Sequence, residues 1–125
     1  MYKGENEKDN LNQRRKMKLR SSQFLIADDG GIIMGKGRLA ILESIDRTGS
    51  INQTAKELKM SYKSVWSKIK STEKNFGKPV VLADKITGTK LTHEGRALLE
   101  RYRELKDRCI RVDDAIFDDI FPGRE

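Results

Sequence analysis

Apolar residues recur along the chain at helical spacing, interrupted by short polar turns. In residues 35–46 the side chains of Leu39, Leu42 and Ile45 stand three apart, which predicts an amphipathic helix. Gly49 follows at the place where a glycine commonly ends a helix. The pattern therefore predicts a helix that presents one apolar face to a core.

Two further helices are predicted directly afterwards, separated by a short turn. Ser50 and Gln53 form a capping-box pattern, in which the serine hydroxyl accepts from the third helical amide and the glutamine reaches back. The chain turns at Lys59–Met60, where glycine would be easiest, and Ser61 then caps a helix that Gly77 closes. The inward positions are Ile51, Ala55 and Leu58 in the first helix, and Val65, Trp66, Ile69 and Phe76 in the second. This spacing is typical of a helix-turn-helix.

The region before these helices divides into a polar arm and a predicted hairpin. Residues 1–16 are polar and lack periodicity, so we expect a mobile arm. In residues 17–34, Leu19 and residues 24–26 look like strand, and the Asp and Gly residues at 28–31 favour a turn. We therefore expect a β-hairpin ahead of the helices.

A second small hairpin is predicted after the helix-turn-helix. Residues 80–82 read as a strand, and residues 83–90 read as a polar loop with a Thr87–Gly88–Thr89 tip. Leu91 returns as a second short strand. A hairpin in this position corresponds to a wing.

The last predicted element is a long helix over about residues 92–120, capped by Thr92, with residues 121–125 as a tail. Its apolar positions follow a heptad seam, which favours pairing with a second copy, although docking on its own domain is the alternative. They are Leu98, Tyr102, Leu105, Cys109, Val112 and Ile116. The expected fold class is mostly α with small β-hairpins: a winged helix-turn-helix over residues 17–120 that includes this dimerisation helix.

The chain is basic, and the excess positive charge is concentrated in the helix-turn-helix. Its formal net charge is +7 with a pI near 9.6. Residues 51–78 carry seven lysines and two glutamates, whereas residues 93–125 carry more acids than bases. A basic face on a helix-turn-helix indicates double-stranded DNA as the partner, although a solvated charged face is the alternative.

The outward residues of the predicted recognition helix, about residues 61–76, supply hydrogen-bonding groups for base edges near its N-terminus. We expect base-edge contacts from Ser61, Tyr62, Lys63, Ser64, Ser67 and Lys68. We expect phosphate or wing contacts from Ser50, Gln53, Thr54, Lys70, Lys74, Lys85, Thr87, Thr89 and Lys90. For the wing residues, an ordinary hairpin tip of the same composition is the alternative.

The composition argues against catalysis, cofactors and membrane insertion. The chain has one cysteine, Cys109, and one histidine, His93, which are too few for a structural zinc site. A Cys–His catalytic pair is formally possible, but Cys109 falls on the apolar seam, where a packed thiol is expected. No run approaches the ~18 apolar residues of a membrane span. We therefore expect a cytoplasmic protein that is not an enzyme and holds no metal or cofactor.

Taken together, several short motifs resemble the N-terminal DNA-binding domain of the molybdate-responsive regulator family, ModE, which is similar to the winged-helix head of LysR-type regulators. They are Gly49-Ser50-Ile51, Ala55 with Leu58, Met60-Ser61-Tyr62-Lys63, Trp66, and Leu91-Thr92 followed by Gly95. The resemblance covers about residues 17–120. The wing is shorter and has fewer glycines than is usual in the family.

The resemblance implies a sequence-specific transcription factor that dimerises through its first strands and last helix. Full-length members also carry C-terminal oxyanion-binding domains that this sequence does not show, so molybdate binding is not expected. A winged-helix module for protein interaction and a non-specific architectural DNA binder are the alternative functions. A steep salt dependence would favour DNA over a protein partner, and sequence preference would separate a regulator from an architectural binder.

Overall fold

The computed structural model describes residues 17–123. The predicted arm at residues 1–16 and the last two residues of the predicted tail lie outside this range. The chain divides into two units, which are considered separately below. One unit holds residues 22–106, and the described part of the other holds residues 17–21 and 107–123.

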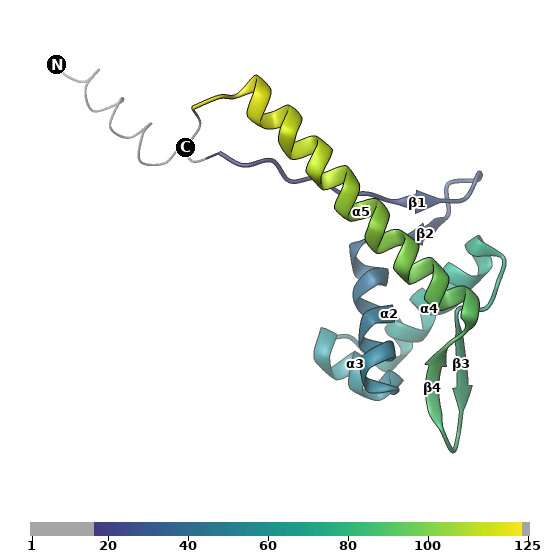
Figure 1. Cartoon of the computed structure of the whole chain (residues 1–125). Coiled ribbons are helices and arrows are strands. Elements are labelled where there is room, and N and C mark those ends of the chain that lie inside the picture. Colours follow the sequence, from purple (N-terminus) through teal and green to yellow (C-terminus); the bar gives the residue numbers. More distant parts are fainter. Residues whose placement is uncertain (1–16, 124–125) are drawn as a thin grey trace. The chain divides into compact units, whose positions relative to one another are not determined.

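Three helices form the centre of the larger unit (Figure 1). They are α2 (Lys36–Thr48), α3 (Ile51–Leu58) and α4 (Tyr62–Phe76), and all three predicted helices are confirmed. Their apolar faces meet in one core with the start of the last helix. Its fully buried members include Met34, Ile41, Ile45, Val65, Ile69 and Leu99. Burial of this continuous core provides the main driving force for folding.

The N-terminal hairpin is present but shorter than predicted. Strands β1 (Leu25–Ile26) and β2 (Ile32–Met34) pair antiparallel around a turn in which Gly30 has φ 93°. The Gly31 amide donates to Asp29 Oδ1 at 3.0 Å, as expected of an Asp-Gly turn. Leu19 lies outside both strands, so its assignment to strand was wrong.

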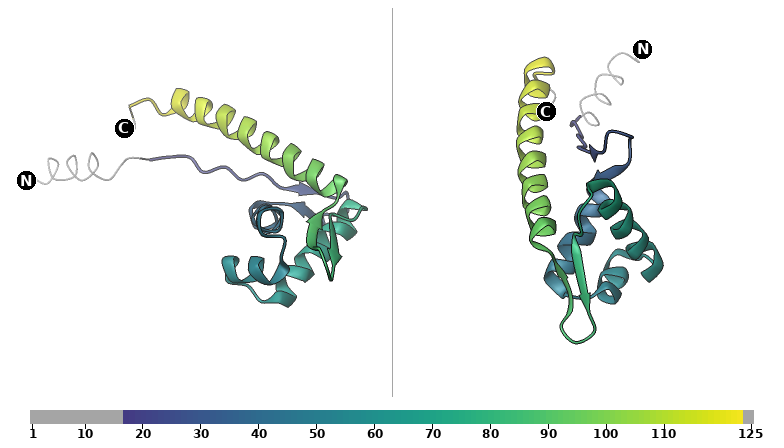
Figure 2. Two further views of the ribbon diagram at one scale, coloured as in Figure 1. Left: turned by 60° about the horizontal axis from the view of Figure 1, so that its bottom comes forward. Right: turned by 90° about the vertical axis from the view of Figure 1, so that its right-hand side faces the viewer.

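The second hairpin is the wing, and it projects away from the helices in Figure 1 and in the right-hand view of Figure 2. Strands β3 (Val81–Asp84) and β4 (Gly88–Leu91) pair antiparallel, with Asp84 opposite Gly88. The turn is therefore at residues 85–87, and the predicted Thr87–Gly88–Thr89 tip was wrong by about two residues. Asp84 causes this shift, because its carboxylate accepts from the amides of Ile86 and Thr87 at 2.7 and 2.9 Å.

The long helix α5 (His93–Ile120) begins where the wing ends. The Thr92 hydroxyl caps it by accepting from the Gly95 amide at 2.8 Å, and donates to the Pro79 carbonyl at 2.7 Å. A Cβ at Gly95 would lie 2.1 Å from the Val80 carbonyl oxygen. Glycine is therefore required here, because the backbone before β3 passes directly over the first turn of α5.

In the smaller unit, apolar side chains from the second half of α5 and from the segment before β1 surround an open depression of about 220 Å³. Its lining residues are Leu19, Asp113, Ile116, Phe117, Ile120 and Phe121. The rings of Phe117 and Phe121 lie 5.3 Å apart. Ile116 and Ile120 nevertheless remain more than half exposed.

A charged hydrogen-bond network links α2 to α3. Arg47 donates to both carboxylate oxygens of Glu57, at 2.7 and 2.9 Å, and the buried Ser44 hydroxyl donates to the same carboxylate at 2.7 Å. The Arg47 hydrogen bonds, and after them the one from Ser44, lower the pKa of Glu57 to about 2. The ionised Glu57 therefore contributes to holding the first two helices together.

We expect Gly95→Ala to destabilise the domain by about 1–3 kcal/mol, because the added methyl group must displace the backbone at Val80. Gly37→Ala is the matched control, since a Cβ at Gly37 meets nothing within 4 Å and alanine favours helix by about 1 kcal/mol. Urea unfolding of both variants measures the difference. Equal stability of the two variants would contradict the close approach at Gly95.

We expect the Glu57 network to stabilise the fold above about pH 4.5, with its contribution lost as the pH falls toward about 2, because the pKa of Glu57 is lowered from 4.5 to about 2 on folding. Glu57→Gln should therefore flatten the loss of stability in this window. Glu100→Gln, an exposed carboxylate on α5, serves as the control. Urea unfolding at several pH values tests this, and identical pH profiles for wild type and Glu57→Gln would rule out the network as the cause.

Candidate nucleic-acid interface

The turn between α3 and α4 sets how the second helix leaves the first. Lys59 adopts the left-handed conformation with φ 55° and ψ 46°, and the Met60 amide donates to the Ala55 carbonyl at 2.9 Å. The sequence predicts a turn at Lys59, where glycine would adopt the left-handed conformation most easily. A lysine in this conformation costs roughly 1 kcal/mol of folding free energy. Ser61 then begins α4 by accepting from the Ser64 amide at 3.0 Å, so the predicted cap is confirmed.

One face of α4 is buried and the opposite face is exposed. Val65, Ile69 and Thr72 are at most 2% exposed and face the core. At 100° per residue, the side chains directly opposite belong to Lys63, Ser67, Lys70 and Lys74, all of which are exposed. We call these four residues the outward stripe. It presents three ammonium groups and one hydroxyl, with no acidic residue among them.

Hydrogen bonds and a cation–π contact hold the side chains on the flank of α4 that faces β3. The indole N–H of Trp66 donates to the Tyr62 hydroxyl at 2.8 Å, and Lys70 Nζ lies 5.1 Å from the Trp66 ring centroid. Glu73 accepts from the Val80 and Val81 amides at 2.8 and 3.3 Å, and from Lys70 at 3.4 Å.

Glu73 therefore connects the recognition helix to the base of the wing. Glu73 is not among the functional residues predicted from the sequence. A lone acid on a lysine-rich helix was the available signal, but nothing in the sequence identified its backbone partners.

The opposite flank of α4 faces α2 and β2. Asn75 donates to the Ile32 carbonyl at 2.8 Å, and Arg38 of α2 donates to the hydroxyls of Thr72 and Ser71. Lys68 lies on this flank and lines a small depression with Arg38. Lys68 lies beside α2 and not on the outward stripe. We therefore do not assign it a contact with a base edge, although the sequence predicts one.

The wing has an exposed tip on a fixed base. Lys85, Thr87 and Lys90 are exposed, so the structure leaves them accessible. Thr89 is only 7% exposed, and its amide donates to the Gly49 carbonyl at 2.9 Å. The phosphate contact predicted for the Thr89 side chain is therefore wrong, because this residue attaches the wing to the α2–α3 turn.

The N-terminus of α3 also differs from the prediction in part. The Ser50 hydroxyl accepts from the Gln53 amide at 3.0 Å, which confirms the cap. The Ser50 amide donates to the Thr48 hydroxyl, so the reciprocal Gln53 contact is not formed. Gln53 is exposed, whereas Thr54 is fully buried, so a phosphate contact from the Thr54 side chain was a wrong prediction.

The predicted dimer seam on α5 has a buried first part and a more exposed second part. Leu98 and Tyr102 are 8% and 1% exposed and belong to the domain's own core. Tyr102 donates to the Gln23 carbonyl at 2.6 Å, and burial raises the pKa of its phenol. Their assignment to a dimer seam was therefore wrong. Further along the same stripe, Cys109 is partly buried, and the apolar side chains of Leu105, Val112 and Ile116 are 38–58% exposed.

Residues 17–123 contain neither a helix that could span a membrane nor a cluster of metal-ligating side chains. None of the helices in this range is long and apolar enough to cross a membrane. Across the same residues, no cluster of three or more His, Cys, Asp or Glu side chains could hold a metal ion.

Relatives in sequence match about two thirds of the chain. The chain is 35% identical over 82 residues to the molybdenum transport protein ModE of Azotobacter vinelandii, which covers 62% of the chain and 30% of ModE. It is also 35% identical over 91 residues to the transcriptional regulator ModE of Yersinia pestis, covering 68% and 34%. The chain thus spans about a third of the length of these curated relatives.

Solved structures support the fold. The DNA-binding domain of CbnR, in complex with DNA, superposes with a TM-score of 0.58 at 21% identity, covering 68% of this chain and 97% of that one. Full-length CbnR with its target DNA gives a TM-score of 0.56 at 22% identity, covering 66% and 28%. The family model for bacterial regulatory helix-turn-helix proteins of the lysR family matches residues 37–96. The chain therefore contains a LysR-type helix-turn-helix DNA-binding domain over residues 37–96, and ModE regulators are similar to the chain over part of its length.

Proposed function

We propose that this chain is a sequence-specific regulator of transcription that binds double-stranded DNA as a homodimer, with α4 in the major groove. The observation that carries the proposal is the outward stripe of α4, in which Lys63, Ser67, Lys70 and Lys74 stand opposite a buried apolar face. A helix held in this way presents donors on its free side, where a groove can accept it.

The N-terminal turns of α4 suit base reading. Lys63 can donate to guanine O6 and N7, and the hydroxyls of Ser64 and Ser67 can donate or accept. The Tyr62 hydroxyl accepts from Trp66 and keeps its own hydrogen for DNA, while the Ser61 hydroxyl is occupied in capping. We therefore assign base edges to four residues in this turn: Tyr62, Lys63, Ser64 and Ser67.

We assign phosphate contacts to residues that surround the base-reading turns of α4. Lys70 and Lys74 extend the outward stripe toward the C-terminus of α4, and the wing offers Lys85, Thr87 and Lys90. The first amides of α3, after Ser50, point out of a helix N-terminus that favours anions. Such contacts position the protein on the duplex and do not read sequence.

The proposed homodimer interface is the exposed part of the apolar face of α5. Val112 and Ile116 are 58% and 51% exposed, and Ile120 continues the same face at 62%. Spacing by four residues along one helix suits pairing with a second copy. Two recognition helices about 34 Å apart would then meet successive major grooves.

We expect Lys63→Ala to relax sequence preference and Lys70→Ala to weaken binding to all sequences alike. Loss of a guanine contact costs ~1–3 kcal/mol at one base position, whereas loss of a phosphate contact is independent of sequence. Selection of duplexes from a random pool by wild type and both variants gives the preferences, and fluorescence anisotropy gives the affinities. If both variants enrich the wild-type motif and lose affinity equally on every duplex, Lys63 does not read a base.

We expect Val112→Asp to shift the protein from dimer to monomer, because a carboxylate would be desolvated at the centre of the exposed α5 stripe. Ala115→Asp, at an exposed position a quarter-turn off the stripe, is the matched control and should remain dimeric. Sedimentation velocity measures both. A Val112→Asp variant with the wild-type sedimentation coefficient would exclude this face as the dimer interface.

A further inference from the structure

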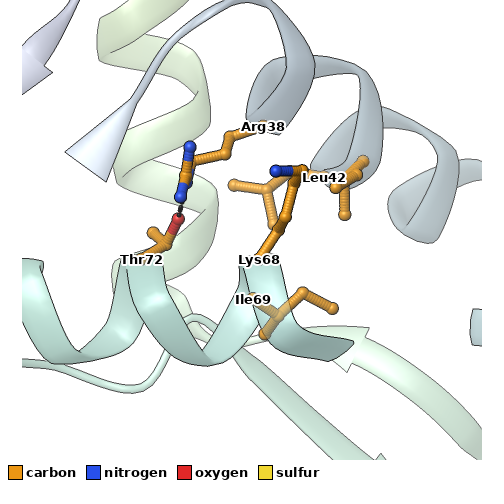
Figure 3. A pocket seen from close by; sticks show the side chains of 6 residues that line it. Arg38, Leu42, Lys68, Ile69 and Thr72 are labelled. Carbon is orange, nitrogen blue, oxygen red and sulfur yellow. Dashed lines mark hydrogen bonds between the residues drawn. The ribbon is translucent and has the colours of Figure 1, made fainter. Parts of the chain in front are cut away.

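Arg38 of α2 and Lys68 of α4 place two cations at the edge of one depression (Figure 3). The side chain of Arg38 reaches from α2 toward Thr72, and the side chain of Lys68 rises from α4 alongside Leu42. The apolar residues Ile41, Leu42 and Ile69 line the depression beneath them. Neither cation belongs to the outward stripe.

Two hydroxyl groups fix the guanidinium of Arg38. Its Nε donates to Thr72 Oγ1 at 2.9 Å, and its Nη2 donates to Ser71 Oγ at 3.3 Å. The Thr72 hydroxyl donates in turn to the Ile33 carbonyl at 3.1 Å. Since a guanidinium has five N–H donors, these two bonds orient the group and leave other donors for a ligand.

The positive charge at this place is not neutralised within the described residues. Both acceptors of Arg38 are neutral hydroxyls, and burial is the one influence that lowers the pKa of Arg38. A half-buried guanidinium is normally paired with a carboxylate, because desolvating an unpaired charge is costly. Here a second cation, Lys68, stands beside it.

An oriented guanidinium beside an ammonium group suits a phosphate, which offers several oxygen acceptors and the opposite charge. The location of Arg38 and Lys68 on the domain favours DNA as the source of this phosphate. Lys68 is adjacent to Ser67, so this flank of α4 lies at the edge of the surface proposed to enter the groove. A sugar-phosphate strand borders the major groove on each side, and the base-reading residues would bring one of them to this flank.

We propose that Arg38 and Lys68 together bind one DNA phosphate on the α2 side of α4. The inference rests on the proposed DNA-binding function and adds a contact that the outward stripe does not provide. Arg38 has a second effect, because the same guanidinium that binds the phosphate also holds α4 to α2. The contact therefore fixes both the position of the protein on the duplex and the orientation of the recognition helix.

The test measures affinity of the full chain for two duplexes, one enriched from a random pool and one scrambled, between 50 and 200 mM salt. The slope of log affinity against log salt counts released counterions, at about 0.9 per phosphate contact. Lys68→Gln should reduce this slope by about one and weaken both duplexes by the same factor. Arg38→Gln should reduce the slope by the same amount, and the exposed Arg101→Gln on α5 is the charge-matched control with an unchanged slope.

Lys68→Gln keeps the proposal testable even if Arg38→Gln fails to fold, because Lys68 makes none of the hydrogen bonds that hold Arg38. A wild-type slope and affinity for Lys68→Gln would overturn the proposal, and so would a loss confined to one duplex. Stabilisation of wild type by inorganic phosphate, absent in Lys68→Gln and without any change in the DNA slope, would assign the site to a free anion instead. If wild type binds neither duplex in a salt-dependent way, the proposed function itself fails.

Discussion

The structure depends first on the burial of one apolar face of α4 in the core of the larger unit. Val65 and Ile69 are fully enclosed, which fixes the rotation of the helix about its axis. The turn at Lys59 and the cap at Ser61 then fix where α4 starts. Once this rotation is set, the side chains on the opposite face of α4 point away from the core, where polar residues can bind a partner.

The electrostatics of the domain follow from the same arrangement. The helix-turn-helix contains two acidic residues, and both are occupied within the fold. Glu57 holds Arg47 and Ser44, while Glu73 accepts from the backbone before and within β3. Because these carboxylates face inward or sideways, the lysines of the outward stripe define the potential on the exposed side. The basic surface therefore depends on where the two acidic side chains form their hydrogen bonds, as well as on the number of lysines.

Local signals in the sequence predicted most of the fold, because caps, glycines and helical periodicity act over a few residues. Ser61, Gly49 and the buried Val65 were all assigned correctly from such signals. The errors concern contacts between distant segments. Thr89 looked like a polar wing residue but is buried against the α2–α3 turn, and the seam on α5 did not show that its first two positions, including Tyr102, complete the domain's own core. Periodicity identifies an apolar face, whereas the chain's tertiary packing decides what covers it.

The most direct measurement of the central claim is photo-crosslinking to a bound duplex from a crosslinking amino acid placed at Ser67, in the middle of the outward stripe. The same group placed at Arg101, exposed on α5, is the control. If α4 enters the major groove, position 67 crosslinks to bases in the groove of each half-site and position 101 does not. Crosslinking from position 101 alone, or equally from both positions, would show that α4 does not enter the groove.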